Sequence, residues 1–368
     1  MNDGNDGDNG NDRNDGGNGN GGSGPVRRYD VVVVGGGAAG LGGALTLARA
    51  RRSVLVIDAG SPRNAPAAHA HNYLGREGVP PLELLAIGRE EAAGYGAEIV
   101  EGKAVSAEKL PGGGFRVVQE DGSEVEARRL LVATGLADEL PPVPGLAGRW
   151  GAEVLHCPYC HGWEVRDRPV GILAVSPMAV HQALLWRQWT DDVVLFRHEQ
   201  ADFGDEEYER LAARGIAVVD GEVAGVEVED GRLTGVRLAG GTVVPREAVV
   251  VQPRFTVRSG VLESLGLVPA AMETGGHVIG SYIASDPASG ATEVPGVWVA
   301  GNVTNLMEQL IGSAAAGLKA ASSINMDLIT EDTARAVEAR RSPFSAEAER
   351  QVSERVLGDA RHGLTENR

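Results

Sequence analysis

The sequence predicts an α/β protein built from two Rossmann-like, three-layer nucleotide-binding domains. Two observations support this fold class. A layout of buried strand, connecting loop, helix and second strand occurs at 31–58, and a similar layout restarts at 169–196. The chain of 368 residues is also long enough to bury two cores, since domains typically hold roughly 100–200 residues each.

The first layout has the glycine spacing of a dinucleotide-binding unit. A run of valines at 31–34 predicts a strand buried on both faces of a parallel sheet. After it, Gly35 permits a tight turn and Gly37 lets the backbone approach a pyrophosphate. Gly40 lets the helix predicted at 41–50 pack closely against the strand.

An acidic residue completes this unit. Asp58 follows a strand predicted at 54–57, and a carboxylate there can accept hydrogen bonds from ribose hydroxyls. Strand, glycines, helix, second strand and acid occur in register, which is far more specific than a glycine motif alone. Further elements are predicted downstream: a helix at 82–95, a meander at 115–132, a strand at 169–175, a helix at 178–189, a strand at 193–196, a meander at 222–251, a strand at 297–302 and a helix at 312–325.

Composition excludes several classes of protein. The chain carries 34 Lys and Arg against 51 Asp and Glu, a formal net charge of −17, which argues against nucleic acid or anionic lipid as a partner. No apolar run reaches the ~18 residues that span a bilayer, and the N-terminus lacks signal regions. Two cysteines cannot form a disulfide scaffold in a chain of this length. We therefore expect a cytoplasmic protein without nucleic-acid or membrane partners.

The two ends of the chain are expected to lie outside the domains. Residues 1–27, mostly Asn, Asp and Gly, have almost nothing to bury and are expected to be disordered. Residues 331–368 are rich in acids and arginines and predict a solvated helical tail, interrupted at Ser342-Pro343.

The chemistry is predicted at Cys157-Pro158-Tyr159-Cys160-His161, between the two layouts. Two thiols separated by two residues can close a disulfide locally, and the spacing favours a stabilised thiolate. His161 adds a titratable group within reach. A zinc half-site would need a second ligand pair, and the chain has no other cysteine. Covalent haem attachment normally accompanies export, and an incidental pair of cysteines is the remaining alternative.

Together these motifs resemble the low-molecular-weight thioredoxin reductase family of flavoproteins. The resemblance covers Tyr29 to Asn325 and rests on the glycine motif, the Ala133-Thr134-Gly135 strand end, the Cys-x-x-Cys pair and the closing Gly301-Asn302 segment with Gln309. It implies FAD as cofactor, a homodimer and a discontinuous FAD-binding domain at 28–150 and 286–330. An inserted NAD(P)H-type domain at 151–285 would carry the dithiol.

The resemblance also implies roles for individual residues. Cys157, Cys160 and His161 would be catalytic, with Cys160 facing the flavin and Cys157 exchanging with substrate. His161 stands where the reductases have an acid, and Asn302 stands where they have an aspartate. The cofactor-binding set would be Gly35, Gly37, Ala39, Gly40, Asp58, Ala59, Arg63, Asn64, Thr134, Gly135, Gly301, Asn302 and Gln309.

The inserted domain departs from an NADPH-dependent reductase. Ala174, Val175 and Ser176 replace the expected turn glycines, so side chains would occupy the space of a pyrophosphate. Arg197 occurs in Phe196-Arg197-His198-Glu199, where Glu199 would repel a 2′-phosphate. The inserted domain is therefore predicted to be a degenerate NAD(P)-type domain.

This departure, with Cys-Pro-Tyr-Cys-His-Gly-Trp-Glu, resembles the flavin-dependent dithiol oxidases of gliotoxin and holomycin biosynthesis. The resemblance implies an oxidase that forms an intramolecular disulfide in a small-molecule, natural-product dithiol, with O2 as the expected acceptor giving H2O2. An NAD(P)H- or ferredoxin-dependent thioredoxin-disulfide reductase is the alternative, and a noncatalytic flavin-bound redox sensor is a third. His69 and His71 would line the substrate cleft, serve as a second base or be solvated loop residues.

Overall fold

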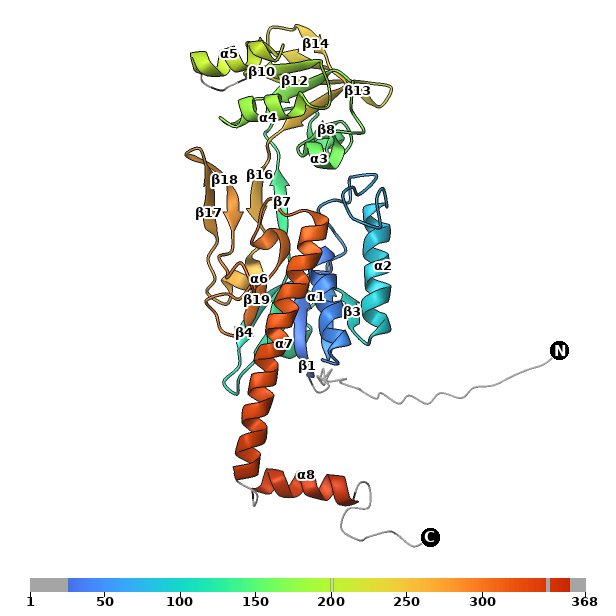
Figure 1. The fold of residues 1–368 in the computed structure, drawn as a ribbon, viewed down its shortest axis with the longest axis vertical. Coiled ribbons are helices and arrows are strands. Elements are labelled where there is room, and N and C mark those ends of the chain that lie inside the picture. Colours follow the sequence, from blue (N-terminus) through green and yellow to red (C-terminus); the bar gives the residue numbers. More distant parts are fainter. Residues whose placement is uncertain (1–25, 199, 201, 342–344, 358–368) are drawn as a thin grey trace, which may run out of the picture.

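The computed structural model describes residues 26–198, 200, 202–341 and 345–357. These residues form two lobes joined by extended strands, and a long helix runs along the first lobe and beyond it (Figure 1). The predicted α/β class is confirmed. Most of the predicted disordered tail and the break at Ser342-Pro343 lie outside the described residues. Arg27, expected within that tail, instead begins strand β1 (Arg27–Val34), where it pairs with Val125.

The first lobe is built on a mixed sheet with the strand order β3-β2-β1-β6-β5-β4, and β19 pairs with β6. Strands β1, β2, β3, β6 and β19 are parallel to one another, whereas β5 pairs antiparallel with both β6 and β4. The remaining strands of this sheet are β2 (Val54–Asp58), β3 (Glu98–Glu101), β4 (Ala104–Lys109), β5 (Phe115–Gln119), β6 (Glu124–Val132) and β19 (Val297–Val299).

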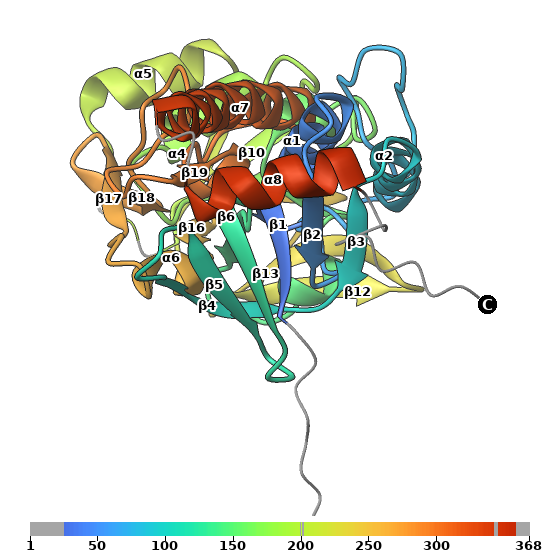
Figure 2. The same cartoon turned by 90° about the horizontal axis from the view of Figure 1, so that it is seen from below.

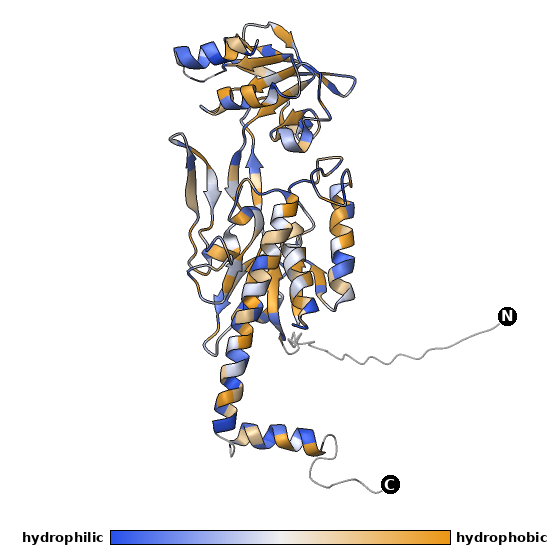
Figure 3. Cartoon of the chain, in the orientation of Figure 1, coloured by the Kyte–Doolittle hydropathy of each residue, from blue (hydrophilic) through white to orange (hydrophobic). Residues whose placement is uncertain are grey.

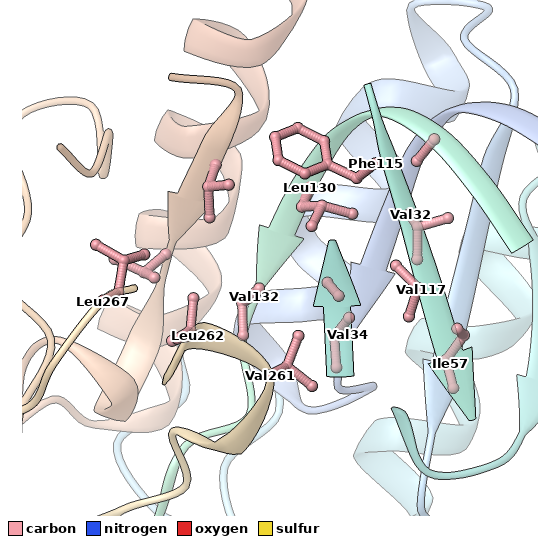
Figure 4. Packing of buried hydrophobic residues seen from close by; sticks show 14 of the residues in the cluster. Val32, Val34, Ile57, Phe115, Val117, Leu130, Val132, Val261, Leu262 and Leu267 are labelled. Carbon is pink, nitrogen blue, oxygen red and sulfur yellow. The ribbon is translucent and has the colours of Figure 1, made fainter. Parts of the chain in front are cut away.

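Apolar side chains cover both faces of this sheet, as the uninterrupted valine run predicts. On one face, Val32 and Val34 pack with β5, β6 and helix α6 (Gly260–Glu263), as Figure 4 shows. On the other face, Val31 and Val33 pack with helices α1 (Ala38–Arg49) and α7 (Leu310–Arg341). The glycine loop is therefore fixed between a buried strand and a buried helix.

The second lobe contains the predicted second layout. Its parallel sheet has the order β11-β10-β9-β15-β8, with a small antiparallel sheet, β12-β13-β14, packed beside it. The strands are β8 (Val154–Leu155), β9 (Val170–Leu173), β10 (Val193–Phe196), β11 (Ala217–Val219), β12 (Val223–Glu229), β13 (Arg232–Leu238), β14 (Val243–Pro245) and β15 (Ala248–Val251). The helices are η1 (Ala147–Arg149), α3 (Pro158–His161), α4 (Ala179–Trp186) and α5 (Asp205–Ala213).

A further sheet, with the order β17-β18-β16-β7, corrects the expected boundary of the inserted domain. Strand β16 (Arg254–Val257) pairs with β7 (Leu136–Glu139), which directly follows the first-lobe sheet. Val257, Leu262 and Ile283 share the first-lobe core with β1. The chain therefore returns to the first lobe at β16 and not at residue 286, because the hairpin of β17 (Ala270–Thr274) and β18 (His277–Tyr282) extends β16.

Helices flank the first-lobe sheet and continue past it. Helix α2 (Pro81–Gly94) lies beside α1, and α7 packs lengthwise on α1. The short helix η2 (Gly301–Val303) links β19 to the segment before α7. Helix α7 extends well past its predicted end at 325, and α8 (Ala346–Leu357) lies across its foot with mixed hydropathy (Figures 2 and 3). No helix in the described ranges is long and apolar enough to cross a membrane.

Candidate functional site

A cavity of about 1150 Å³ lies between the lobes and is lined by both of them. The first lobe contributes the glycine loop and the segment after β2, and the second lobe contributes α3 with its two cysteines. Of the predicted site residues, all but Gly40 line this cavity: Gly35, Gly37, Ala39, Asp58, Ala59, Arg63, Asn64, Thr134, Gly135, Cys157, Cys160, His161, Gly301, Asn302 and Gln309. The fold therefore places the predicted FAD-binding residues, called the cofactor cradle below, and the two cysteines around one cavity.

The glycine loop has one open position and one closed position. A Cβ atom built on Gly37 would have no neighbour within 4 Å, so this residue leaves free space that a bound group can occupy. A Cβ on Gly40 would lie 1.8 Å from the carbonyl oxygen of Gly35. Gly40 therefore permits close packing of helix and turn and does not contact the cavity.

Asp58 lies at the end of β2, as predicted, and organises the loop. Its Oδ1 accepts a hydrogen bond of 3.0 Å from the backbone N–H of Gly36. Its Oδ2 pairs with the guanidinium of Arg89 on α2, a partner that the sequence did not reveal. The contact of Asp58 with a ribose stays a prediction.

Arg63 lines the cavity together with the cofactor cradle and the two cysteines. It forms a two-point ion pair with Asp138, with 2.8 Å from Nε to Oδ2 and 2.6 Å from Nη2 to Oδ1. Its Nη1 lies 3.4 Å from Oδ1 of Asn302, and its guanidinium carbon lies 5.1 Å from the centre of the Phe255 ring. Asp138 and Phe255 were not predicted, because their strands join this site only through the pairing of β7 with β16.

Helix α3 positions the two thiols. Cys157 precedes its first residue, Pro158, and the backbone N–H groups of Cys160 and His161 each donate to the Cys157 carbonyl at 3.2 Å. Both cysteines are free thiols and partly buried. The hydrogen bond from Cys160 lowers the pKa of Cys157 to about 7, although burial opposes this. The same bond raises the pKa of Cys160, so Cys157 is the thiol that ionises first.

Two histidines flank the dithiol and both are held neutral. Burial lowers the pKa of His161, while the carboxylate of Glu164 partly opposes this. Burial and the charge of Arg63 lower the pKa of His156 to about 4. The His156 ring contacts Phe255 edge-on, with 5.4 Å between ring centres, and lines the cavity. Only its position next to Cys157 in the sequence could have drawn attention to it.

The loop before α2 reaches from the first lobe to the dithiol helix. His71 lies between two carboxylates, with Nδ1 2.6 Å from Oε1 of Glu77 and Nε2 3.3 Å from Oε1 of Glu164. Asn72 donates its side-chain amide to the carbonyl of Tyr159 at 2.6 Å. Both His69 and His71 line the cavity. His71 bridges two carboxylates, whereas His69 is exposed and contacts the carbonyl of Gly78.

Aromatic residues surround the dithiol helix on its second-lobe side. The Tyr159 ring packs edge-on against Trp189, with 5.6 Å between ring centres, and Tyr159 lines the cavity. Trp163 does not line the cavity and remains 66% exposed, with the Arg166 guanidinium 4.1 Å from its ring centre. Of these two aromatic residues, only Tyr159 therefore lines the cavity.

The turn between β9 and α4 carries buried side chains where the family resemblance places glycines. Ala174 is fully buried and Ser176 is 6% exposed. Arg197 is engaged in an ion pair with Asp220, and Nδ1 of His198 accepts the N–H of Val223 at 3.0 Å. Glu199 lies outside the described residues. A small cavity of about 430 Å³ borders this turn, lined in part by prolines of the connecting segment.

Comparison with known proteins agrees with this architecture. Residues 29–325 match the model of the pyridine nucleotide-disulphide oxidoreductase family. The thioredoxin reductase tcpT of Claviceps purpurea is 31% identical over 81% of this chain and 95% of its own length. A probable thioredoxin reductase of Arthroderma benhamiae is 34% identical, and the match spans only 44% of that protein.

A solved structure extends the comparison to the whole fold. The crystal structure of HlmI has a TM-score of 0.79 and 46% sequence identity, and the match covers 86% of this chain and 97% of HlmI. These proteins are FAD-binding flavoproteins, so the cofactor predicted from the sequence, FAD, is confirmed. The chain belongs to the pyridine nucleotide-disulphide oxidoreductase family and is a thioredoxin reductase-like oxidoreductase within it.

Proposed function

We propose that this protein is an FAD-dependent dithiol oxidase that closes an intramolecular disulfide in a small natural-product dithiol. Two electrons and two protons leave the substrate thiols, and O2 takes them to give H2O2. One observation carries the proposal: the cysteine pair shares its cavity with the glycine loop of the first lobe, whereas the corresponding turn of the second lobe carries buried side chains in place of glycines.

The cavity fits FAD on the evidence of its glycine loop. The open position at Gly37 provides space for a diphosphate next to the start of α1, where backbone N–H groups favour anions. Asp58 lies at the end of β2, where it can accept hydrogen bonds from a ribose, and Asn302, which contacts Arg63, and Gln309 also line the cavity. When bound, FAD supplies a two-electron acceptor that can itself be reoxidised by oxygen.

The dithiol would act by thiol–disulfide exchange. In the oxidised enzyme a substrate thiolate attacks Sγ of Cys157, the Cys157–Cys160 bond breaks, and Cys160 leaves as a thiolate. The second substrate thiolate then attacks the substrate sulfur of the mixed disulfide and releases Cys157. Because the pKa of Cys157 is lowered to about 7, it is a good leaving group in this second step. Loss of two electrons from the two cysteine thiolates restores the enzyme disulfide, and the two protons are those released when the substrate thiols ionise.

His161 would take the substrate proton. It belongs to the same short helix as the cysteines and lines the same cavity. Burial lowers its pKa, so its imidazole is neutral near pH 7 and can accept a proton from a substrate thiol. His71, which bridges Glu77 and Glu164, lies close enough to influence the charge of His161.

A thioredoxin-disulfide reductase driven by NAD(P)H or ferredoxin is the second candidate. The names of several relatives, including tcpT and a sirT protein of Leptosphaeria maculans at 27% identity, favour it. The side chains of Ala174 and Ser176 in the turn and the ion pair of Arg197 with Asp220 argue against NADPH binding. A homodimer, expected from the family resemblance, is proposed for either activity.

Anaerobic stopped-flow spectroscopy of the purified flavoprotein separates the two candidates. A model dithiol should bleach the flavin absorbance, and air should restore it with one H2O2 for each disulfide formed. NADPH should leave the flavin oxidised. Rapid bleaching by NADPH, followed by reduction of thioredoxin, would instead establish the reductase.

A further inference from the structure

The charge around the dithiol comes from few side chains. Of the described side chains beside the thiols, His156 and His161 can carry a positive charge, but burial lowers the pKa of both. His71 lines the same cavity, but it lies between the carboxylates of Glu77 and Glu164, which offset a positive charge on its ring. Near neutral pH, a permanent positive charge at the dithiol therefore has to come from elsewhere.

Arg63 supplies that charge from the opposite lobe. A guanidinium stays protonated at every pH at which the protein is folded. Its charge lowers the pKa of both Cys157 and Cys160, in addition to the larger effect of the hydrogen bond between the thiols on Cys157. Arg63 also lines the shared cavity next to the predicted cradle.

The guanidinium is fixed in position. Asp138, whose side chain is only 7% exposed, grips two of its nitrogens, and the Phe255 ring lies under its plane. A long arginine side chain in solution samples many rotamers, and these contacts remove that freedom before substrate arrives. The positive charge is therefore preorganised.

Asn302 also contacts the Arg63 guanidinium, and it does so with a neutral side chain. Its Nδ2 lies within hydrogen-bond distance of the carbonyl oxygens of Asn305 at 3.0 Å, Leu306 at 3.3 Å and Glu308 at 2.9 Å. These acceptors fix the amide so that Oδ1 points to Arg63. A carboxylate at the same place would set a negative oxygen against these carbonyls, so the loop is built for a neutral side chain.

We propose that Arg63 is the fixed cation that stabilises the thiolate form of the dithiol, and that Asp138 and Asn302 are positioning residues that hold it there. The inference rests on the proposed function, because it assigns Arg63 a part in the thiol chemistry of the same cavity. Asp138 supplies the one carboxylate in contact with the Arg63 guanidinium among the described residues, and Asn302, which is neutral, adds no second negative charge beside it.

The test measures one thiol without any turnover. In the Cys160→Ser background Cys157 is the single thiol of the chain, and the serine hydroxyl can still donate to it. The rate of alkylation by iodoacetamide is followed against pH with the FAD-loaded protein in the absence of substrate and oxygen. Arg63→Gln should raise the apparent pKa of Cys157 by about one pH unit, which slows alkylation roughly tenfold below that pKa. Asn302→Asp should also raise the apparent pKa of Cys157.

Arg258 provides the matched control. It lines the same cavity, but its Nη1 contacts the carbonyl of Ser61 at 3.3 Å. It does not appear among the main causes of the pKa shifts of Cys157 and Cys160. Arg258→Gln should leave the profile unchanged. An unchanged profile in Arg63→Gln, or an equal shift in Arg258→Gln, would overturn the inference.

The readout separates this inference from the proposed function. If a variant loses FAD, its pH profile of alkylation is compared with that of the parent stripped of FAD. This comparison is valid because Asp138 and Phe255 belong to the protein and hold Arg63 without the cofactor. A protein that shows the Arg63 shift but oxidises no dithiol would refute the proposed function alone. A protein that oxidises dithiols and shows no shift would refute the role of Arg63 alone.

Discussion

Nε of Arg197 lies 2.7 Å from Oδ1 of Asp220, so the arginine best placed to hold a 2′-phosphate is already paired within the second lobe. Releasing this arginine should not be sufficient to create an NADPH site, because the turn still carries the buried side chains of Ala174 and Ser176 in place of glycines. We therefore expect Asp220→Ala, like the parent, to keep its flavin oxidised when NADPH is added without oxygen. Absorbance at the flavin maximum is the measurement, and a small dithiol that bleaches both proteins is the control. Bleaching of the variant alone would mean that the ion pair is the main block.

The two cysteines should give different spectra when each is replaced by serine. Cys160→Ser should lack the long-wavelength charge-transfer band of a thiolate beside oxidised flavin, whereas Cys157→Ser should retain or reveal it. The reason is the proposed division of roles, in which Cys160 faces the flavin and Cys157 exchanges with substrate. Both variants should lose dithiol oxidation by at least 100-fold, about 3 kcal/mol at 1.4 kcal/mol per factor of ten. Full activity in both would exclude the exchange mechanism.

His161→Ala should slow dithiol oxidation by roughly 10²–10⁴-fold, the usual contribution of a positioned acid–base group. The pKa of His161 is lowered by burial, so its neutral, proton-accepting form is present above that lowered value and is lost as pH falls through it. The parent rate should therefore decline on an acidic limb that lies below the ordinary histidine pKa of about 6.5.

The control for His161→Ala is the pH profile together with the flavin content. The variant should lose the acidic limb of the parent and keep its FAD. A variant that retains the limb would assign that titration to another group, and one that loses FAD would show a structural role for His161.

Local sequence patterns predicted the parallel sheets because buried β-branched runs admit few alternatives. The valines of 31–34 and the glycine at 35 lie where expected, whereas the short helix that begins after Cys157 was not predicted. The return of the chain at β16 could not be predicted, because β7 and β16 are separated by the whole second lobe. Their pairing depends on tertiary contacts that no local pattern encodes.

The same limit explains which site residues were missed. Asp138 and Phe255 reach the site only because β7 and β16 pair, and His156 becomes informative only once its ring is seen packed against Phe255. His71 could be singled out in the sequence, but its two carboxylate partners come from different segments. Motifs that bind through backbone geometry are visible in a sequence, whereas charge clusters assembled from distant strands are not.

The glycine loop offers a test that separates cofactor binding from folding. Gly37 has φ −78° and ψ −173°, a backbone conformation that any residue can adopt, and its Cβ position is open. Gly37→Leu should therefore fold with a nearly unchanged melting temperature, while its side chain fills the cradle and lowers FAD affinity at least tenfold. Fluorescence titration of the cofactor-stripped protein with FAD measures that affinity.

Gly40→Ala is the matched variant with the opposite expectation. Its methyl group would meet the Gly35 carbonyl oxygen at 1.8 Å, so helix α1 must move away from the turn. Overpacking of this kind costs about 2 kcal/mol, which should appear as a lower midpoint in urea unfolding of the cofactor-stripped protein. Gly37→Leu could instead destabilise the protein as much as Gly40→Ala and still bind FAD with the parent's affinity. The introduced leucine side chain would then lie outside the space of the cofactor, and FAD would bind elsewhere in the cavity.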